Sequence, residues 1–269
     1  MSPDPALLSL NTATVKAQWT LAQMIDGCAR HGIRGIAPWR DKVAELGLRK
    51  SVSLVKNHGL TVTGLCRGGF FTAKDWQDDN RRAIEEAHEL GAQCLVLVVG
   101  GLPEGSKNLP RARERVQECI SKILPEARKA GVPLAIEPLH PMQAAERACV
   151  NTLEQALDIC DALGDGIGVA VDVYHVWWDP KLESQIARAG SKRILGYHIC
   201  DWLVPTRDLL NDRGMMGDGV IDLPRIRSWV EAAGYKGFHE VEIFSERDWW
   251  RRDPDEVLRI MKERHRRAS

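Results

Sequence analysis

The sequence predicts an α/β protein built as a single (β/α)8 TIM barrel over residues 1–269. Short apolar runs rich in Val, Ile and Leu alternate with longer helical patterns, and this pair of elements repeats eight times. Strands that alternate with helices pair in parallel, and eight such units close a barrel. The chain length of 269 residues also suits a fold that typically has about 250.

Glycine marks the boundaries between most helices and the strands that follow. A glycine suits the left-handed residue that ends a helix, and seven of them precede an apolar run: Gly32, Gly59, Gly91, Gly131, Gly164, Gly190 and Gly234. The expected strands cover residues 7–11, 33–38, 60–66, 93–99, 132–137, 167–173, 194–199 and 237–243. The expected helices cover residues 18–30, 41–57, 77–90, 110–130, 151–163, 180–189, 222–233 and 253–266. A doubly wound sheet is disfavoured, because no Gly-x-Gly-x-x-Gly motif follows the first strand.

Composition excludes several classes of partner. Lys plus Arg and Asp plus Glu each number 37, so the formal net charge is zero and nothing global favours nucleic acid or an anionic membrane. No apolar run reaches 18 residues, and the N-terminus does not resemble a signal peptide. The seven cysteines form no Cys-x-x-Cys pair, which indicates free thiols and a cytoplasmic location.

The last four predicted strands each end in an ionisable residue of a type that binds metals: Glu137, Asp172, His198 and Glu242. Strand alternation places all four on the inner face, and the carboxyl ends of barrel strands are where such folds carry out chemistry. Three carboxylates and one imidazole suit one divalent metal ion, for which we expect Mn²⁺, with Mg²⁺, Co²⁺ and Zn²⁺ as alternatives. Glu240 competes with Glu242 for the last ligand position, and Glu242 is preferred because it lies nearer the strand end.

Four stretches around these residues resemble a known family. Residues 136–141, 172–175, 197–201 and 240–243 read IEPLHP, DVYH, YHICD and EVEI. They are similar to motifs of the sugar phosphate isomerase/epimerase superfamily, with its xylose isomerase-like barrel, which includes ketose 3-epimerases, hydroxypyruvate isomerases and inosose dehydratases. The resemblance implies that the four residues above bind one divalent metal ion and that Glu137 and Glu242 also act as the catalytic acid and base.

The expected function is that of a metal-dependent isomerase or epimerase acting on a ketose, a keto-sugar or a cyclitol ketone. A metal that polarises the carbonyl acidifies the adjacent C–H group, so that a carboxylate can remove the proton and form a metal-bound enediolate. Reprotonation then epimerises or isomerises the substrate. Loss of a β-hydroxyl would instead make the enzyme a lyase (dehydratase), and the sequence leaves this alternative open.

Six further residues are expected to contact a small-molecule sugar substrate: His175, Arg213, His140, Trp177, Trp202 and Glu240. The resemblance implies the first two, although residues 202–210 form an insertion ahead of Arg213. His140 either contacts substrate or supports Glu137, and Glu240 either binds or supports the site. The tryptophans cover a sugar face or lie in a subunit interface of a possible homo-oligomer. The turn at residues 214–219 either offers its N–H groups to an anion or simply leads into the next helix.

Two other classes of function are less favoured. An apurinic-site endonuclease of the same fold needs further histidines after the third and fourth strands, where this chain has Cys66-Arg67-Gly68-Gly69 and Val99-Gly100-Gly101. Together with the zero net charge, this argues against a nucleic-acid substrate. A non-catalytic sugar-binding subunit is disfavoured by the intact pair of Glu137 and Glu242.

Overall fold

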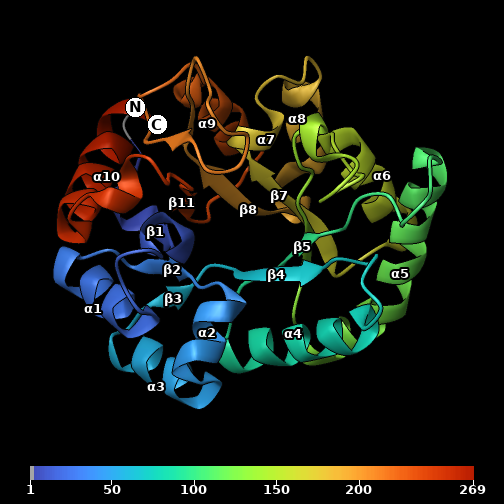
Figure 1. Ribbon diagram of the computed structural model, residues 1–269, viewed down its shortest axis with the longest axis horizontal. Coiled ribbons are helices and arrows are strands. Elements are labelled where there is room, and N and C mark those ends of the chain that lie inside the picture. Colours follow the sequence, from blue (N-terminus) through green and yellow to red (C-terminus); the bar gives the residue numbers. More distant parts are fainter. Residues whose placement is uncertain (1–2) are drawn as a thin grey trace.

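A computed structural model describes residues 3–269 and contains the predicted barrel (Figure 1). Nine strands form one sheet in the order β3-β2-β1-β11-β8-β7-β6-β5-β4, and each pairing within it is parallel. The strands are β1 (Leu8–Asn11), β2 (Gly35–Ala37), β3 (Thr61–Val62), β4 (Leu65–Gly69), β5 (Leu95–Val98), β6 (Leu134–Ile136), β7 (Ile167–Asp172), β8 (Ile194–Ile199) and β11 (His239–Val241).

The third predicted strand, residues 60–66, differs from expectation. It is interrupted after Val62 and continues as β4 to Gly69, so its two halves pair with different neighbours, β3 with β2 and β4 with β5. An isolated parallel bridge between Trp39 and Cys66 links the chain after β2 to β4 and nearly closes the barrel. Gly69 has φ +92°, and a Cβ there would lie 2.3 Å from the carbonyl oxygen of Val98, so only glycine fits this end of β4.

Helices surround the sheet (Figure 1). They are α1 (Leu21–His31), α2 (Arg40–Leu46), α3 (Leu48–Asn57), α4 (Trp76–Leu90), α5 (Leu109–Ala130), α6 (Leu153–Leu163), α7 (Val173–Val176), α8 (Leu182–Arg193), α9 (Leu223–Ala232) and α10 (Pro254–Ala268). The single helix expected over 41–57 is two helices, because Gly47 has φ 91° and ψ 132° and breaks the helical path. At the N-terminus of α1, Thr20 and Gln23 form a capping box.

Two apolar layers support the site. The larger core fills the space between strands and helices, where Leu134 and Ile136 of β6 are fully buried. Inside the barrel a smaller cluster consists of Cys66, Cys94, Val96, Ala135 and Ala170, with Trp39 and Leu195 packed against it. Small residues below the strand ends leave room above them for large functional side chains.

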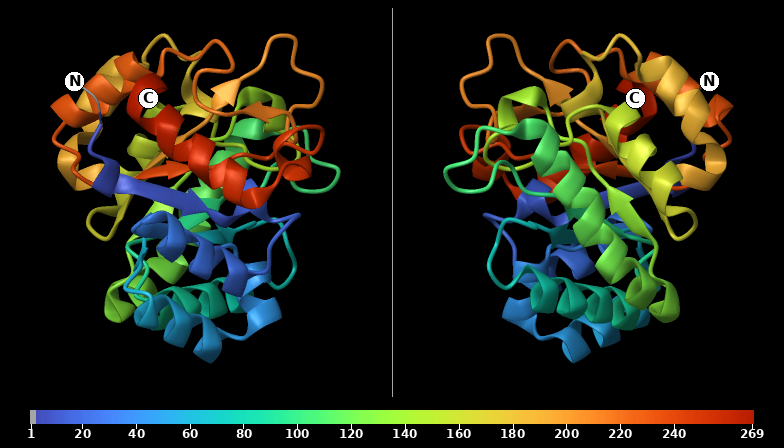
Figure 2. Two further views of the ribbon diagram at one scale, coloured as in Figure 1. Left: turned by 90° about the vertical axis from the view of Figure 1, so that its left-hand side faces the viewer. Right: turned by 90° about the vertical axis from the view of Figure 1, so that its right-hand side faces the viewer.

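One further hairpin extends the carboxyl end of the barrel. β9 (Asp201–Trp202) and β10 (Arg213–Gly214) pair antiparallel, and the loop between them is the segment predicted to be an insertion, seen as a projecting orange loop in Figure 2. The hairpin is fixed to the chain after β11, because the Arg213 N–H donates to the Phe244 carbonyl at 2.9 Å. Among the described residues, no helix is long and apolar enough to span a membrane.

Candidate metal centre and active site

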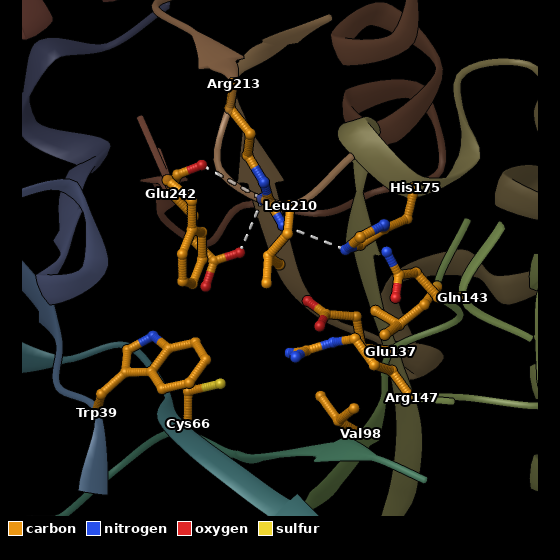
Figure 3. Close-up of a pocket in the computed structure, with 12 residues that line it drawn as sticks. Trp39, Cys66, Val98, Glu137, Gln143, Arg147, His175, Leu210, Arg213 and Glu242 are labelled. Carbon is orange, nitrogen blue, oxygen red and sulfur yellow. Dashed lines mark hydrogen bonds and ion pairs between the residues drawn. The ribbon is translucent and has the colours of Figure 1, made fainter. Parts of the chain in front are cut away.

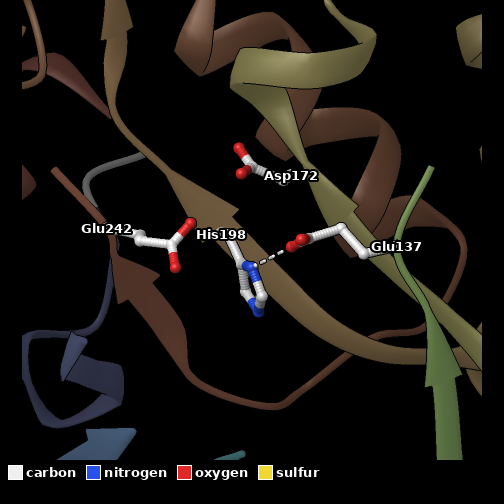
Figure 4. A group of neighbouring side chains, drawn as sticks. All are labelled: Glu137, Asp172, His198 and Glu242. Atoms are coloured by element: carbon white, nitrogen blue, oxygen red, sulfur yellow. Dashed lines mark hydrogen bonds and ion pairs between the residues drawn. The ribbon is translucent and has the colours of Figure 1, made fainter. Parts of the chain in front are cut away.

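The four candidate ligands converge at the carboxyl end of the barrel. Glu137 follows β6 directly, Asp172 ends β7, His198 is the next-to-last residue of β8, and Glu242 follows β11 directly. All four are buried, and one ligand atom from each lies within 4.8 Å of the others (Figure 4). The strand register explains this convergence, because Asp172 is paired with His198 across β7 and β8.

His198 lies between two carboxylates. Its Nδ1 is 2.9 Å from Glu137 Oε1, and its Nε2 is 3.6 Å from Glu240 Oε1. Burial disfavours a charged imidazole, but the carboxylates of Glu240, Glu137 and Glu242 outweigh that effect and hold the pKa of His198 well above its ordinary value. Nδ1 of His198 thus faces Glu137 of the cluster, while Nε2 faces the Glu240 carboxylate, which can orient the ring.

Glu240 lies in the barrel interior beside the cluster. Asn11 donates its side-chain N–H to Glu240 Oε1 at 2.7 Å, and the Thr63 hydroxyl donates to Glu240 Oε2 at 2.9 Å. The same Asn11 amide donates to Glu242 Oε1 at 3.0 Å. Glu240 is thus occupied by neutral donors on both oxygens, and Glu242 is the one that lies within the four-residue group.

Arg213 connects the two sides of the cluster. Its Nη1 is 3.1 Å from Asp172 Oδ2. Figure 3 shows its contacts with Glu242, whose Oε2 is 3.0 Å from Nη1, and with His175, whose Nε2 is 3.2 Å from Nη2. The guanidinium also lies over the ring of Tyr174, 4.4 Å from its centroid. The β9–β10 hairpin therefore delivers this arginine to the site despite the insertion that precedes it.

Burial tunes the protonation of the groups around Arg213. It raises the pKa of Glu242 to about 8, with a further contribution from the negative charges of Glu137 and Asp172, while the Arg213 charge acts in the opposite direction. For His175 the direction is reversed, since burial and the neighbouring Arg213 charge hold its pKa well below the ordinary value. His175 is consequently neutral at physiological pH.

A pocket opens above the cluster (Figure 3). It is lined by Trp39, Cys66, Val98, Glu137, Leu139, Gln143, Arg147, His175, Leu210, Arg213, Glu242 and Phe244. Two of the six residues expected to contact substrate, His175 and Arg213, line this pocket. The other four, His140, Trp177, Trp202 and Glu240, are not among its lining residues.

The two predicted tryptophans belong to an aromatic cluster next to the pocket. The Trp202 ring lies 4.7 Å from the Tyr174 ring, 5.0 Å from the His140 ring and 5.9 Å from the Trp177 ring, measured between centroids. The backbone N–H of His140 lies 3.2 Å from His175 Nδ1. These residues support Tyr174 and His175, which in turn contact Arg213.

The turn at residues 214–219 binds an anion that the chain itself provides. The backbone N–H groups of Gly217, Gly219 and Ile221 donate to the Asp201 carboxylate at 2.8–3.0 Å. Of the two interpretations of this turn, the structure favours the one in which it leads into the next helix, because the Asp201 carboxylate already occupies these donors. Asp201 fixes the path of the chain from the hairpin into α9.

Three polar residues of the site were not predicted. Asn11 ends β1, much as the four candidate ligands lie at the ends of their strands. The same positional argument could have identified it, but Asn11 is neutral and only ionisable residues were considered. Gln143 and Arg147 lie in the loop after β6, where no local pattern distinguishes them from surface residues. Only the folded chain brings them to the pocket.

The fold is a TIM barrel, and the strand-end cluster is a group of residues that could hold a metal ion. The chain matches the Xylose isomerase-like TIM barrel family over residues 25–264 and belongs to that family. It is 26% identical to an inosose isomerase of Bacillus velezensis, with 95% of this chain and 94% of the relative covered.

Solved structures are similar over nearly the whole chain. A crystal structure of a protein from Sinorhizobium meliloti 1021 shares 62% identity, covers 98% of this chain and 99% of that one, and superposes with a TM-score of 0.96. The IolI protein, whose structure contains a bound zinc atom, is 24% identical, covers 98% of this chain and 96% of its own, and has a TM-score of 0.81. The second likeness supports the fold.

Proposed function

We propose that this protein is a divalent-metal-dependent sugar isomerase or epimerase that moves a proton at the carbon next to a ketone. The observation that carries the proposal is the buried group of Glu137, Asp172, His198 and Glu242 beneath an open pocket. The inosose isomerase relative supports a keto-sugar or cyclitol ketone as the substrate class.

The residues present fit a divalent ion. Three buried carboxylates within 4.8 Å of one another are costly unless their charge is balanced, and a hard or borderline cation balances it with oxygen and nitrogen ligands. The four residues of the group would hold the ion. When bound, it would polarise the substrate carbonyl and acidify the neighbouring C–H group.

The two glutamates supply the proton transfer. Glu137 and Glu242 extend from strands separated by β7 and β8, so their carboxyl groups approach the pocket from two sides. One removes the proton from the carbon next to the carbonyl, and the other returns a proton to the opposite face or to the neighbouring carbon. The first outcome is epimerisation and the second is isomerisation.

The remaining polar groups position the substrate. The guanidinium of Arg213 neutralises part of the charge on Asp172 and Glu242 and presents N–H donors to substrate oxygens. Neutral His175 offers a further polar contact at the same side of the pocket. Trp39 and Phe244, whose ring centroids are 5.5 Å apart, form an apolar wall suited to a sugar face.

The test is proton NMR in D2O with metal-reconstituted protein and a panel of inososes, 3-keto-sugars and ketoses. We expect loss of the C–H signal next to the carbonyl, dependent on metal and on Glu242. The product separates the alternatives, because a dehydratase would release an unsaturated or rearranged product in place of an epimer or isomer. Metal-loaded protein that exchanges no proton in any panel member would contradict the proposal.

A further inference from the structure

Arg147 points into the pocket without a partner. Its guanidinium extends into the pocket that Glu137 and Glu242 also line (Figure 3). Within residues 3–269, the Arg147 side chain has no hydrogen bond and no ion pair. By contrast, most helical arginines among the described residues are paired with a carboxylate, for example Arg40 with Asp79 at 3.0 Å. Because its own side chain has no such partner, Arg147 is free to pair with a ligand.

The loop that carries Arg147 is held firmly in place. The Gly100 N–H donates to the Arg147 carbonyl at 2.9 Å, and the Leu102 N–H donates to the Ala145 carbonyl at 2.8 Å. A Cβ added to Gly101 would lie 2.1 Å from that Ala145 carbonyl oxygen, so the close approach of loop and strand end requires glycine. The unpaired arginine is consequently presented by an anchored backbone and not by a loose loop.

A second arginine lies next to the same pocket. Arg67 of β4 packs over the Phe70 ring, 3.9 Å from its centroid, and within the described chain it forms no ion pair. It lines an adjoining hollow that shares Trp39 and Cys66 with the pocket. Burial lowers the pKa of Arg67, and the positive charge of Arg147 lowers it further, which indicates that the two guanidinium groups act on one region.

These observations favour an anionic ligand group. A partly buried guanidinium without a partner has lost part of its hydration, and a bound anion would offset the cost of that loss in free energy. Its planar array of donors fits the two oxygens of a carboxylate or phosphate, whereas the hydroxyls of a neutral sugar are served equally well by an amide such as Gln143. The reacting end of the pocket already contains Arg213 as the counter-charge to Asp172 and Glu242. Arg147 is thus available to bind a part of the substrate other than its reacting end.

We propose that the substrate carries a carboxylate or phosphate group remote from its ketone, and that Arg147 binds this anion, with Arg67 in the adjoining hollow adding positive charge. The proposal rests on the proposed function for the reacting end of the substrate. It narrows the substrate class from keto-sugars in general to keto-sugar acids or phosphates.

The test compares compounds that differ only at the carbon remote from the ketone. One set is fructose, fructuronate and fructose 6-phosphate, and the other is tagatose, tagaturonate and tagatose 6-phosphate. Proton exchange in D2O gives kcat/KM for each compound with metal-loaded protein, and calorimetric titration gives its affinity. The variants are Arg147→Met, Arg147→Lys and, as a matched control for loss of an exposed charge, Arg82→Met on the surface of α4.

We expect kcat/KM for the acid or the phosphate to exceed that of the neutral sugar by about 10- to 100-fold. The ratio should fall to about one in Arg147→Met, recover in part in Arg147→Lys and stay unchanged in Arg82→Met. The acid and phosphate arms identify which anion is preferred. Melting curves establish that each variant is folded.

The remaining outcomes separate the two proposals. Exchange without preference for anionic compounds, or a preference that survives in Arg147→Met, overturns the anion site and leaves the proposed function standing. If no compound exchanges, either here or in the wider panel of inososes, 3-keto-sugars and ketoses, but the anionic ones bind and Arg147→Met abolishes that binding, the anion site stands and the proposed function fails. Neither exchange nor Arg147-dependent binding would overturn both.

Discussion

The two halves of the barrel contribute different chemistry. Three acids and a histidine lie at or next to the ends of β6, β7, β8 and β11, whereas β1 ends in Asn11, β4 ends in Gly69, and Gly100 and Gly101 lie shortly after β5. Under the proposed function, this acidic half would hold the metal ion and transfer protons. The neutral half supplies the Trp39 side of the pocket wall and the Asn11 amide that donates to the acids. It also supplies glycine backbone, such as Gly101, that another loop approaches closely. The proposed function therefore assigns different roles to the two halves of the barrel.

The largest effect we expect concerns the acidic half. Glu242→Gln removes the base and weakens a ligand while preserving side-chain size, so kcat should fall by about 10²- to 10⁴-fold. The D2O exchange assay measures this loss. Glu246→Gln, an exposed change four residues further along the chain, is the control and should retain activity. Full activity in Glu242→Gln would transfer the role of base to another residue.

The next prediction concerns the contact between the halves. Asn11 of β1 donates to both Glu240 and Glu242, at 2.7 and 3.0 Å, and its own carbonyl oxygen accepts from the Trp39 indole at 3.0 Å. Asn11→Ala leaves two buried carboxylates without this donor and removes the acceptor of the Trp39 indole N–H, so that the Trp39 ring is no longer held in place. We expect a loss of about 1–3 kcal/mol in the free energy of unfolding and roughly a tenfold loss in kcat/KM.

Denaturant titration and the exchange assay together measure the effect of Asn11→Ala. Asn57→Ala, at an exposed position on α3, serves as the control. An Asn11→Ala protein with unchanged stability and activity would mean that the neutral half does not position the acids.

A smaller effect is expected within the neutral half itself. In Gly101→Ala the new methyl group would meet the Ala145 carbonyl at 2.1 Å and displace the loop that carries Arg147. We expect a stability loss of about 2 kcal/mol, which corresponds to roughly 4–8 °C in melting temperature. Gly64→Ala is the matched control, because Gly64, like Gly101, does not have a left-handed backbone and a Cβ there would meet its nearest neighbours at 3.5 Å or more. Equal melting temperatures for the two variants would contradict the close packing.

The same comparison explains what sequence could and could not predict. Repeated strand and helix units predicted the barrel, and Glu137, Asp172, His198 and Glu242 were identified because an ionisable residue at the end of an apolar strand is conspicuous. The residues of the acidic half can therefore be recognised from local sequence patterns. Nothing local marks Arg147, whose place in the pocket depends on the hydrogen bonds between its loop and the end of β5.

Local patterns also failed where the neutral half or the loops depend on tertiary contacts. The third strand was expected to end at residue 66, but glycine at 68 and 69 allows β4 to continue beside β5. The turn at 214–219 had two possible interpretations, because its local sequence does not show that Asp201 occupies its N–H groups. Trp177 and Trp202 were expected to cover a sugar face or to lie in a subunit interface. Their rings lie 5.9 Å apart beside the pocket, and a contact with substrate stays a prediction.

The smallest effect we expect tests the acidic half through pH. Burial raises the pKa of Glu242 to about 8, and Asp172 and His198 are also shifted upwards, so the metal-free folded protein retains protons that the unfolded chain would release. Between the unfolded value near 4.3 and the folded value, the folded state of Glu242 binds more protons than the unfolded state. The stability of the metal-free protein should therefore fall as pH rises through this window.

A metal ion must displace these protons, so its apparent affinity should rise with pH over the same window. For one displaced proton the change is about tenfold, or 1.4 kcal/mol, per pH unit below the pKa. We expect the rise in melting temperature on adding Mn²⁺ to be roughly 3–6 °C larger at pH 7.5 than at pH 6.5. In Glu242→Gln, which cannot titrate at this position, the difference should shrink. A stabilisation by metal that is the same at both pH values would show that the acidic half holds no displaceable proton, and the distinction between the two halves would then rest on geometry alone.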